Sequence, residues 1–329
     1  MSTASPAQIE KQAKTAADRL AKAKLGIAEV VYGQDRVVDL TLAALLSGGH
    51  TLLVGVPGLA KTLLVETLAT VMGLDNKRVQ FTPDLMPADI IGSEVLEEGA
   101  KGKRSFRFIQ GPAFTQLLMA DEINRASPRT QSALLQAMQE RFVTVAGQRH
   151  DLPAPFHVLA TQNPIEQEGT YPLPEAQLDR FLLQVNVDFP DLETEKTILI
   201  STTGASEAKA KKVITPKQLQ DMQKLVRQLP VGESVVQAIL SLTRNASPDQ
   251  SEYDFVQKHV SWGPGPRAGQ ALMLATRAKA LIEGRLSPSV DDVIDLASPV
   301  LRHRMAISFA ARAEGESVEG IISKLKAKL

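Results

Sequence analysis

The residues from Gly55 to Thr62 (Gly-Val-Pro-Gly-Leu-Ala-Lys-Thr) have the types and the spacing needed to hold a phosphate group. They follow a short apolar run, and an apolar-periodic segment that predicts a helix begins at Lys61. Strand, glycine-bearing turn and helix start are the context of a phosphate-binding P-loop, in which backbone N–H groups surround the β-phosphate. We therefore expect a nucleotide to be held by Gly55, Pro57, Gly58, Leu59, Ala60, Lys61, Thr62 and Leu63.

Two side chains of this segment have specific predicted roles. The Lys61 ammonium would reach the β- and γ-phosphates, and the Thr62 hydroxyl would be a ligand of Mg²⁺. One position departs from the general pattern G-x-x-x-x-G-K-[ST], because Ala60 replaces the second glycine. We expect Ala60 to adopt helical backbone angles at the start of the helix. Taken alone, the segment could also be an ordinary strand–turn–helix corner.

A second motif, made of two adjacent acids, completes the predicted site. The apolar run 117–120 reads as a buried strand that ends in Asp121 and Glu122. Successive strand side chains point to opposite sides, so the two carboxylates can have different roles. Asp121 would hold the Mg²⁺ shell, and Glu122 would polarise the attacking water. The alternative, two helix-capping acids, is disfavoured by the P-loop upstream, and together the motifs predict an ATP site.

Composition argues against nucleic-acid binding, thiol chemistry, a histidine metal site and a membrane span. Lys and Arg total 37 and Asp and Glu total 37, so a net charge of zero provides no overall attraction for nucleic acid or anionic membrane. The chain has no cysteine, which excludes disulfides and thiolate chemistry, and its five histidines form no metal-binding pair. We find no apolar run long enough to span a membrane and no apolar core of a secretory signal. The expected location is the cytoplasm.

The order of predicted elements indicates an α/β fold. Strand-like runs alternate with helical patterns, which is typical of a parallel, doubly wound sheet flanked by helices. A small, polar and basic stretch at 202–212 reads as a linker, and the pattern after Pro216 is helical throughout. We therefore expect an N-terminal solvated helix and an α/β domain over 1–205, followed by a smaller all-helical domain over 206–329. The predicted strands are Thr51–Val54, Val79–Phe81, Leu117–Ala120, Val158–Thr161 and Phe181–Val187.

Two insertions interrupt this alternation. Between the second and third predicted strands, Pro and Gly in the segment 82–92 and the charged stretch 97–107 predict a loop or a short strand pair in place of a helix. After the acidic motif, the segment 141–152 alternates apolar and polar residues around Ala-Gly-Gln, which predicts a hairpin. Both are expected to project from the same region of the sheet edge, as functional loops or as inert decoration.

Taken together, these residues resemble the AAA+ superfamily and, within it, the MoxR family. The resemblance runs from about Val30 to the C-terminus, and MoxR-like P-loops are similar to G-x-P-G-x-A-K-T, with the same alanine. A P-loop ATPase with a parallel five-stranded sheet and a helical lid domain is the fold that this resemblance implies. The strings that carry it are Gly33-Gln34, Gly55–Thr62, Phe81–Asp84, Ala120–Arg125, Thr161–Pro164, Pro174–Phe181 and Gly263–Arg267.

The resemblance also implies roles for residues outside the two ATP motifs. Asn163 matches sensor 1, which orients the attacking water, although an asparagine before a proline is also an ordinary turn residue. Arg180 matches the arginine finger supplied by a neighbouring subunit, the alternative being a local pair with Asp179. Arg267 matches sensor 2, carried by the lid onto the γ-phosphate. The segment on the adenine side of the nucleotide would be Tyr32, Gly33 and Gln34.

The resemblance further implies a homo-oligomeric ring, usually a hexamer, and chaperone-like work on partner proteins, often ones with von Willebrand factor A domains. The insertions are similar to the helix-2 insert and the pre-sensor-1 hairpin of a clade that includes magnesium-chelatase subunits and helicases. A chelatase-like motor subunit therefore stays open as an alternative. A nucleic-acid motor is disfavoured, because the second hairpin offers only Arg141, Arg149 and His150 as basic side chains.

Overall fold

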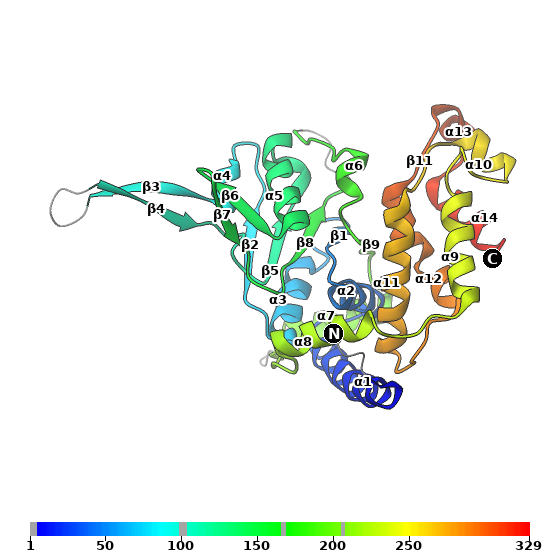
Figure 1. Ribbon diagram of the computed structural model, residues 1–329, viewed down its shortest axis with the longest axis horizontal. Helices are drawn as coiled ribbons and strands as arrows, with labels where there is room; N and C mark the ends of the chain where they lie inside the picture. The colour runs from blue at the N-terminus through cyan, green and yellow to red at the C-terminus, as the bar shows by residue number, and fades with distance from the viewer. Residues whose placement is uncertain (1–4, 99–103, 166–168, 205–207) are drawn as a thin grey trace.

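A computed structural model describes residues 5–98, 104–165, 169–204 and 208–329. A five-stranded sheet forms the centre of the N-terminal part (Figure 1). The strand order is β2-β5-β8-β1-β9, and every neighbouring pair is parallel. This confirms the predicted parallel α/β sheet, with β2 beginning three residues before the predicted strand. The strands are β1 (Thr51–Val54), β2 (Asn76–Gln80), β5 (Leu117–Asp121), β8 (His157–Gln162) and β9 (Leu183–Asn186).

Helices cover both faces of the sheet, and alternation along the strands divides the core between them. Leu53, Met119 and Leu159 belong to the apolar cluster shared with the helices α1 (Pro6–Ala28), α2 (Asp35–Ser47) and α3 (Lys61–Met72). Leu52, Leu118 and Val158 belong to the cluster shared with α4 (Pro87–Ile91) and α5 (Pro128–Glu140). The carboxyl ends of β1, β5 and β8 therefore meet at one edge, which is where a ligand of such a sheet binds.

The first insertion forms a short helix and a long strand pair. After α4, the strands β3 (Gly92–Glu98) and β4 (Arg104–Gln110) pair antiparallel and extend away from the body (Figure 1). The predicted strand pair is thus longer than expected, and residues 99–103 of the predicted segment lie outside the described residues. The second insertion is the predicted hairpin, β6 (Phe142–Val145) and β7 (Gln148–Asp151). His150 stacks on Phe108 at 3.9 Å between ring centroids, so the two hairpins are in contact, which agrees with their predicted projection from one region of the sheet edge.

The C-terminal part is mainly helical. A two-stranded antiparallel sheet of β10 (Val260–Trp262) and β11 (Ala306–Ile307) also lies there, so the prediction of an all-helical unit is wrong in this detail. These strands are too short to leave a pattern of alternation in the sequence. The helices are α8 (Pro216–Val226), α9 (Glu233–Asn245), α10 (Asp254–His259), α11 (Pro266–Ile282), α12 (Val290–Leu301), α13 (Phe309–Ala313) and α14 (Val318–Lys326).

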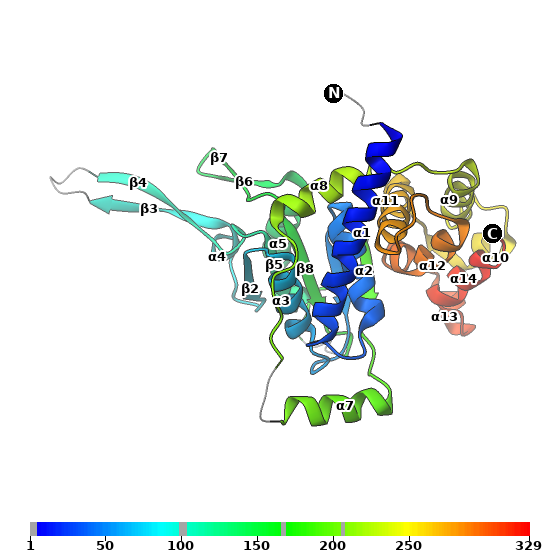
Figure 2. The ribbon, with the colours of Figure 1, turned by 90° about the horizontal axis from the view of Figure 1, so that it is seen from below.

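Two further helices depart from the sequence-based expectations. Helix α1 is not simply solvated, because it buries Leu20 and Ile27 with a row of alanines between the α/β part and the lid. Helix α7 (Leu192–Thr202) was not predicted, and Figure 2 shows it standing apart from the rest of the molecule. The expected domain boundary at 205–206 lies outside the described residues and stays a prediction. None of the helices in the described part of the chain combines the length and apolar character of a membrane span.

Candidate functional site

The P-loop follows β1 and turns sharply beside β9. A Cβ added to Gly55 would lie 2.6 Å from the carbonyl oxygen of Val187, so only glycine fits this close approach. Gly58 has a φ of +86°. Ala60 has a φ of 53° and a ψ of 24°, which corrects the expectation of helical angles there. The left-handed conformation explains why the general motif has glycine at this position.

The Lys61 side chain folds back over the loop. Its Nζ donates to the carbonyl oxygens of Gly55 and of Val56, the latter at 2.9 Å. Burial lowers the pKa of Lys61, and the nearby charges of Asp121 and Glu122 oppose that shift. The ammonium therefore lies between the loop carbonyls and the acidic motif, which is the place from which it can reach a phosphate chain.

The two acids at the end of β5 are held by the neighbouring strand β8. Thr161 Oγ1 donates to Asp121 Oδ1 at 2.5 Å and accepts from the Glu122 backbone N–H at 2.9 Å. Glu122 has a φ of 54°, a conformation that costs energy for a residue other than glycine. One hydroxyl thus fixes Asp121 and the strained backbone of Glu122 together.

Strand β2 supplies two further polar partners that the sequence analysis did not single out. Arg78 Nε donates to Asp121 Oδ2 at 3.2 Å, and Gln80 Nε2 donates to Glu122 Oε2 at 2.7 Å. Both residues flank buried Val79 and lie on the same face of an otherwise polar strand. The sequence shows that Arg78 and Gln80 are two residues apart, so they share one face of a strand. It does not show which strand lies beside β2. Arg125 also contacts Glu122 Oε2, at 3.0 Å.

Most of the predicted site residues line a single hollow of about 460 Å³. Asn163 lies at its edge directly after β8, where its Oδ1 accepts from the Ile165 N–H at 3.1 Å. The residues that line the hollow come from the P-loop, from β2 and from the ends of β5 and β8. They are Pro57, Gly58, Ala60, Lys61, Thr62, Leu63, Arg78, Gln80, Asp121, Glu122, Thr161 and Asn163.

The predicted adenine-side segment is anchored beside the P-loop. Gln34 is buried, and its Nε2 donates to the carbonyl oxygen of Asp188 at 3.3 Å, just beyond β9. Gly33 has a φ of +67°, and a Cβ there would lie 2.3 Å from Thr194 Cγ2 of α7. Tyr32 donates its hydroxyl proton to the Glu29 carbonyl oxygen at 3.1 Å. The segment is therefore fixed between β9 and the start of α7.

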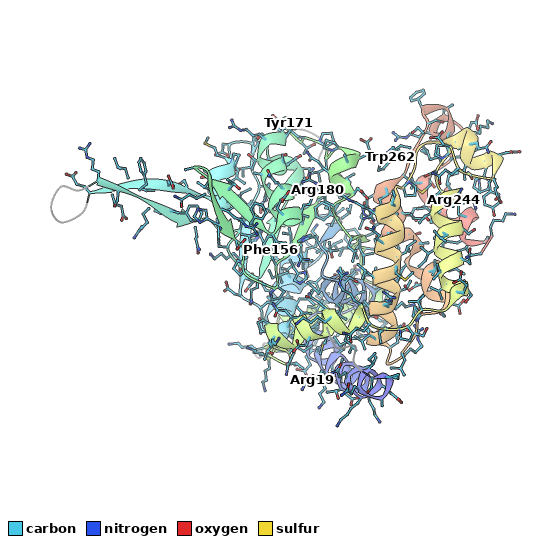
Figure 3. All side chains as sticks on the ribbon, in the orientation of Figure 1. Arg19, Phe156, Tyr171, Arg180, Arg244 and Trp262 are labelled. Carbon is cyan, nitrogen blue, oxygen red and sulfur yellow. The ribbon has the colours of Figure 1, made fainter. Side chains whose placement is uncertain are left out.

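Arg180 and Arg267 do not line the P-loop hollow of their own chain. Both line a separate hollow of about 220 Å³, together with Asp179, His50, Met138 and Gln139. Arg267 Nη1 lies 3.5 Å from Asp179 Oδ2, and Figure 3 labels Arg180 between the α/β layers and α11. The Arg180 Nε is buried and has no hydrogen-bond partner among the residues that the structure describes. The structure thus groups the two arginines with each other.

The position of Arg267 is set by how the lid joins the α/β part. Arg304 of the lid is only 2% exposed, and its Nε donates to Asp179 Oδ1 at 2.7 Å. Its Nη1 and Nη2 donate to the carbonyl oxygens of Leu182 and Phe181, at 3.1 and 2.6 Å. These bonds fix the lid to the segment that carries Arg180, outside the P-loop hollow.

The hollow suits a Mg²⁺ ion that is bound together with a nucleotide. Thr62 and Asp121, predicted to hold the ion, both line it and offer a hydroxyl and a carboxylate oxygen. Mg²⁺ in such sites takes one or two protein ligands and completes its shell with phosphate oxygens and water. Across the described ranges we find no group of three or more His, Cys, Asp or Glu side chains that could hold a metal alone. The donor set therefore fits nucleotide-bound Mg²⁺.

Comparisons with known protein families agree with this geometry. Residues 50–183 match the ATPase family associated with various cellular activities (AAA), and residues 254–325 match the AAA lid domain. The first match contains the P-loop, the acidic motif and Asn163, and it also contains Arg180. The chain is therefore an ATPase with an AAA-type nucleotide-binding site.

Relatives and a solved structure narrow the family. The chain is 42% identical over 307 residues to Chaperone MoxR1 of Mycobacterium tuberculosis, covering 93% of this chain and 80% of that protein. It is 30% identical over 317 residues to Protein MoxR of Paracoccus denitrificans, covering 91% and 92%. A crystal structure from Cytophaga hutchinsonii superposes with a TM-score of 0.89 at 35% identity, covering 97% of both chains. The chain belongs to the MoxR family of AAA+ ATPases.

Proposed function

We propose that this chain is a chaperone-like protein remodeller that assembles into a homo-oligomeric ring, expected to be a hexamer, with ATP hydrolysed between neighbouring subunits. The observation that supports it is the separation of Arg180 and Arg267 from the P-loop hollow. A guanidinium that stabilises the transferring phosphoryl group accelerates related reactions by about 10³-fold or more. A single copy keeps its two candidate arginines on another face, so a second copy has to supply them.

Within one subunit, each polar group has a proposed task. Lys61 and the backbone N–H groups of the P-loop bind the phosphates, and Thr62 and Asp121 hold Mg²⁺, which neutralises phosphate charge. Glu122 accepts the proton of the attacking water, and Asn163 orients that water. Thr161 keeps both acids in place through the bonds described above.

The extended β3–β4 hairpin supports work on proteins. Phe106 and Leu96 face each other across the pair, and both are exposed. Exposed apolar side chains on a projecting element favour contact with an apolar protein surface. The hairpin also carries acids and bases in mixture, including Glu94, Glu97 and Arg107, which gives no attraction for a phosphate backbone.

The second hairpin gives little support to a nucleic-acid motor. Arg149 lies 3.9 Å from the ring centre of Phe142 and pairs with Asp151. Arg141 donates to the carbonyl oxygen of Gly48 at 3.0 Å, and His150 is stacked on Phe108. The three basic side chains of this hairpin are therefore already engaged within the chain. DNA that binds with a steep salt dependence and raises ATP turnover would favour the motor instead.

A mixing experiment tests the shared site. Lys61→Ala removes the phosphate contact and Arg180→Ala removes the supplied guanidinium, so each variant alone should hydrolyse ATP very slowly. In mixed assemblies, an intact P-loop will face an intact Arg180, and turnover should return. If sedimentation shows mixed assemblies and no activity returns, the proposal of a shared site is wrong.

A substrate trap tests the chaperone role. Glu122→Gln should keep ATP bound and block turnover, so that a client protein stays attached to the assembly. Proteins that co-purify with Glu122→Gln in ATP, and not with Lys61→Ala, are the candidate clients. We expect cytoplasmic proteins with von Willebrand factor A domains among them. A chelatase-type partner would indicate the alternative pathway, and recovery of DNA in place of protein would contradict the remodelling function.

A further inference from the structure

Helix α7 presents an apolar stripe that nothing in the described part of its own chain covers. Leu192, Leu199 and Ile200 are 77%, 64% and 66% exposed, and Phe189 just before the helix is 70% exposed. None of the residues of α7 is buried. Thr194 and Ile198 are only partly exposed, so the stripe lies on the outer side of the helix. Four large apolar residues gathered in this way mark an interaction surface.

This helix begins close to the P-loop, whose residues line the ATP hollow. It follows β9, which runs parallel to β1 with Val54 opposite Asn186, so α7 begins beside the P-loop. Its Thr194 packs against Gly33 of the adenine-side segment. A subunit that reaches over the ATP hollow from outside will therefore meet α7 as well.

A groove of matching character lies on the lid. Helices α9 and α11 enclose about 740 Å³, and the lining is largely apolar, with Leu240 half exposed. Gly269 lies in its floor, and a Cβ added there would meet only ordinary contacts at 3.7 Å and beyond, so this position has room for a side chain. Other residues that line it are Val236, Ile239, Thr243, Met273 and Leu274.

The charges at the groove complement those of α7. Arg227 lines the groove. Arg277 lies on α11 one turn beyond Met273, and burial together with the positive charge of Arg227 lowers its pKa. The Arg277 Nε is buried with no hydrogen-bond partner in the part of the chain that the structure describes. The first turn of α7 carries Glu193 and Glu195, both exposed. The groove thus offers Arg227 in its lining, with the positive charge of Arg277 close by, and α7 offers two acids.

We propose that α7 of one copy docks into the α9–α11 groove of the next copy. This inference rests on the proposed function, because the groove begins at Pro266, next to Arg267, on the face that has to approach the neighbouring ATP. Bringing Arg267 to that ATP also brings the groove toward the side of the P-loop where α7 begins. The apolar stripe then fills the groove, and Glu193 and Glu195 lie near Arg227 and Arg277. ATP binding and lid docking become parts of one interface.

The absence of cysteine from the chain allows a direct test by crosslinking. Leu199→Cys labels α7 and Leu240→Cys labels the groove, and both positions are exposed enough to accept the change. The two single variants are mixed with an ATP analogue and a short bis-maleimide. We expect a crosslinked dimer in the mixture and none in either variant alone. A double variant that crosslinks only within one chain, or a mixture that gives no dimer, would overturn the proposal.

Charge exchange and groove filling give a second measurement on the full chain. Glu195→Arg or Arg227→Glu should each weaken ATP-dependent assembly at least tenfold, and the double variant should regain most of it. Gly269→Phe should weaken assembly by filling the groove without strain at the backbone. Glu10→Arg, at an exposed position of α1, is the matched control and should leave assembly unchanged. Equal effects of Glu195→Arg and Glu10→Arg would contradict the proposal.

The docking contact and the shared ATP site are separated by these experiments. If the parent chain assembles and hydrolyses ATP but the mixed Leu199→Cys and Leu240→Cys variants give no dimer, the docking contact is wrong and the ATPase function stands. If that mixture crosslinks but the Arg180→Ala and Lys61→Ala mixture never recovers turnover, the docking contact stands and the shared ATP site is wrong. A parent chain that stays monomeric with ATP analogue overturns the docking proposal.

Discussion

Asp179 accepts a hydrogen bond from Arg304 at 2.7 Å and also lies 3.5 Å from Arg267, so one carboxylate joins the lid to the segment that carries Arg180. Arg304 is buried, and the carbonyl oxygens of Leu182, Val300, Asp179 and Phe181 accept hydrogen bonds from its Nη1 and Nη2. This arrangement fixes both candidate arginines on one face. The lid is therefore bonded to the segment that carries Arg180.

We expect Asp179→Ala to destabilise the fold strongly. The change leaves the buried Arg304 charge without its partner, which costs about 3–5 kcal/mol in comparable pairs. Urea unfolding of the full chain measures it. The control is Asp151→Ala, which removes an exposed pair with Arg149 and should cost about 1 kcal/mol or less. Similar losses for the two variants would mean that Asp179 does not stabilise the buried charge of Arg304.

Three buried histidines predict an acid-sensitive fold. Burial lowers the pKa of His50 to about 3 and that of His157 to about 4, and it also lowers the pKa of His303 well below the usual value. The unfolded chain takes up these protons near pH 6.5, whereas the folded chain does not. Stability is therefore fully present above pH 6.5 and falls as the pH drops toward 4.

The size of this effect is measurable. Between pH 7 and pH 5 each such histidine should remove about 2 kcal/mol of unfolding free energy. Urea titrations at several pH values give the slope. His157→Gln removes one proton site, so its stability should depend less steeply on pH than that of the parent. An unchanged slope in His157→Gln would mean that His157 is not neutral in the folded chain.

The sequence indicates most clearly those parts of the candidate site whose residues are contiguous. The strands of the sheet depend on local order and on alternation, and the parallel α/β sheet is confirmed. The P-loop follows β1 and the Asp121-Glu122 motif lies at the end of β5, so they line one hollow, and their roles stay predictions. Arg78 and Gln80 were missed because their role depends on β2 lying beside β5, a pairing between distant segments. Helix α7 was missed because its apolar residues face outward, against the usual pattern of a helix with a buried face.

Thr161 is expected to position both acids. Thr161→Val keeps the shape of the side chain and leaves the Glu122 N–H without its acceptor, which costs about 1–3 kcal/mol. Loss of comparable supporting bonds lowers activity by about 10- to 100-fold. ATP turnover should therefore fall while ATP affinity changes little, and Thr161→Ser should retain most activity. Equal turnover in Thr161→Val and the parent would mean that Thr161 does not position the two acids.

The left-handed backbone at Ala60 predicts a stabilising substitution in the P-loop itself. A residue with a Cβ at a φ of 53° carries a cost of roughly 1–2 kcal/mol that glycine does not. Ala60→Gly should therefore raise the unfolding free energy by about 1 kcal/mol, although glycine usually weakens a fold. Ala21→Gly, at an exposed position inside α1, is the matched control and should lower it by about 1 kcal/mol. Urea unfolding of the two variants should therefore shift in opposite directions, and a loss of stability in both would mean that Ala60 is not strained.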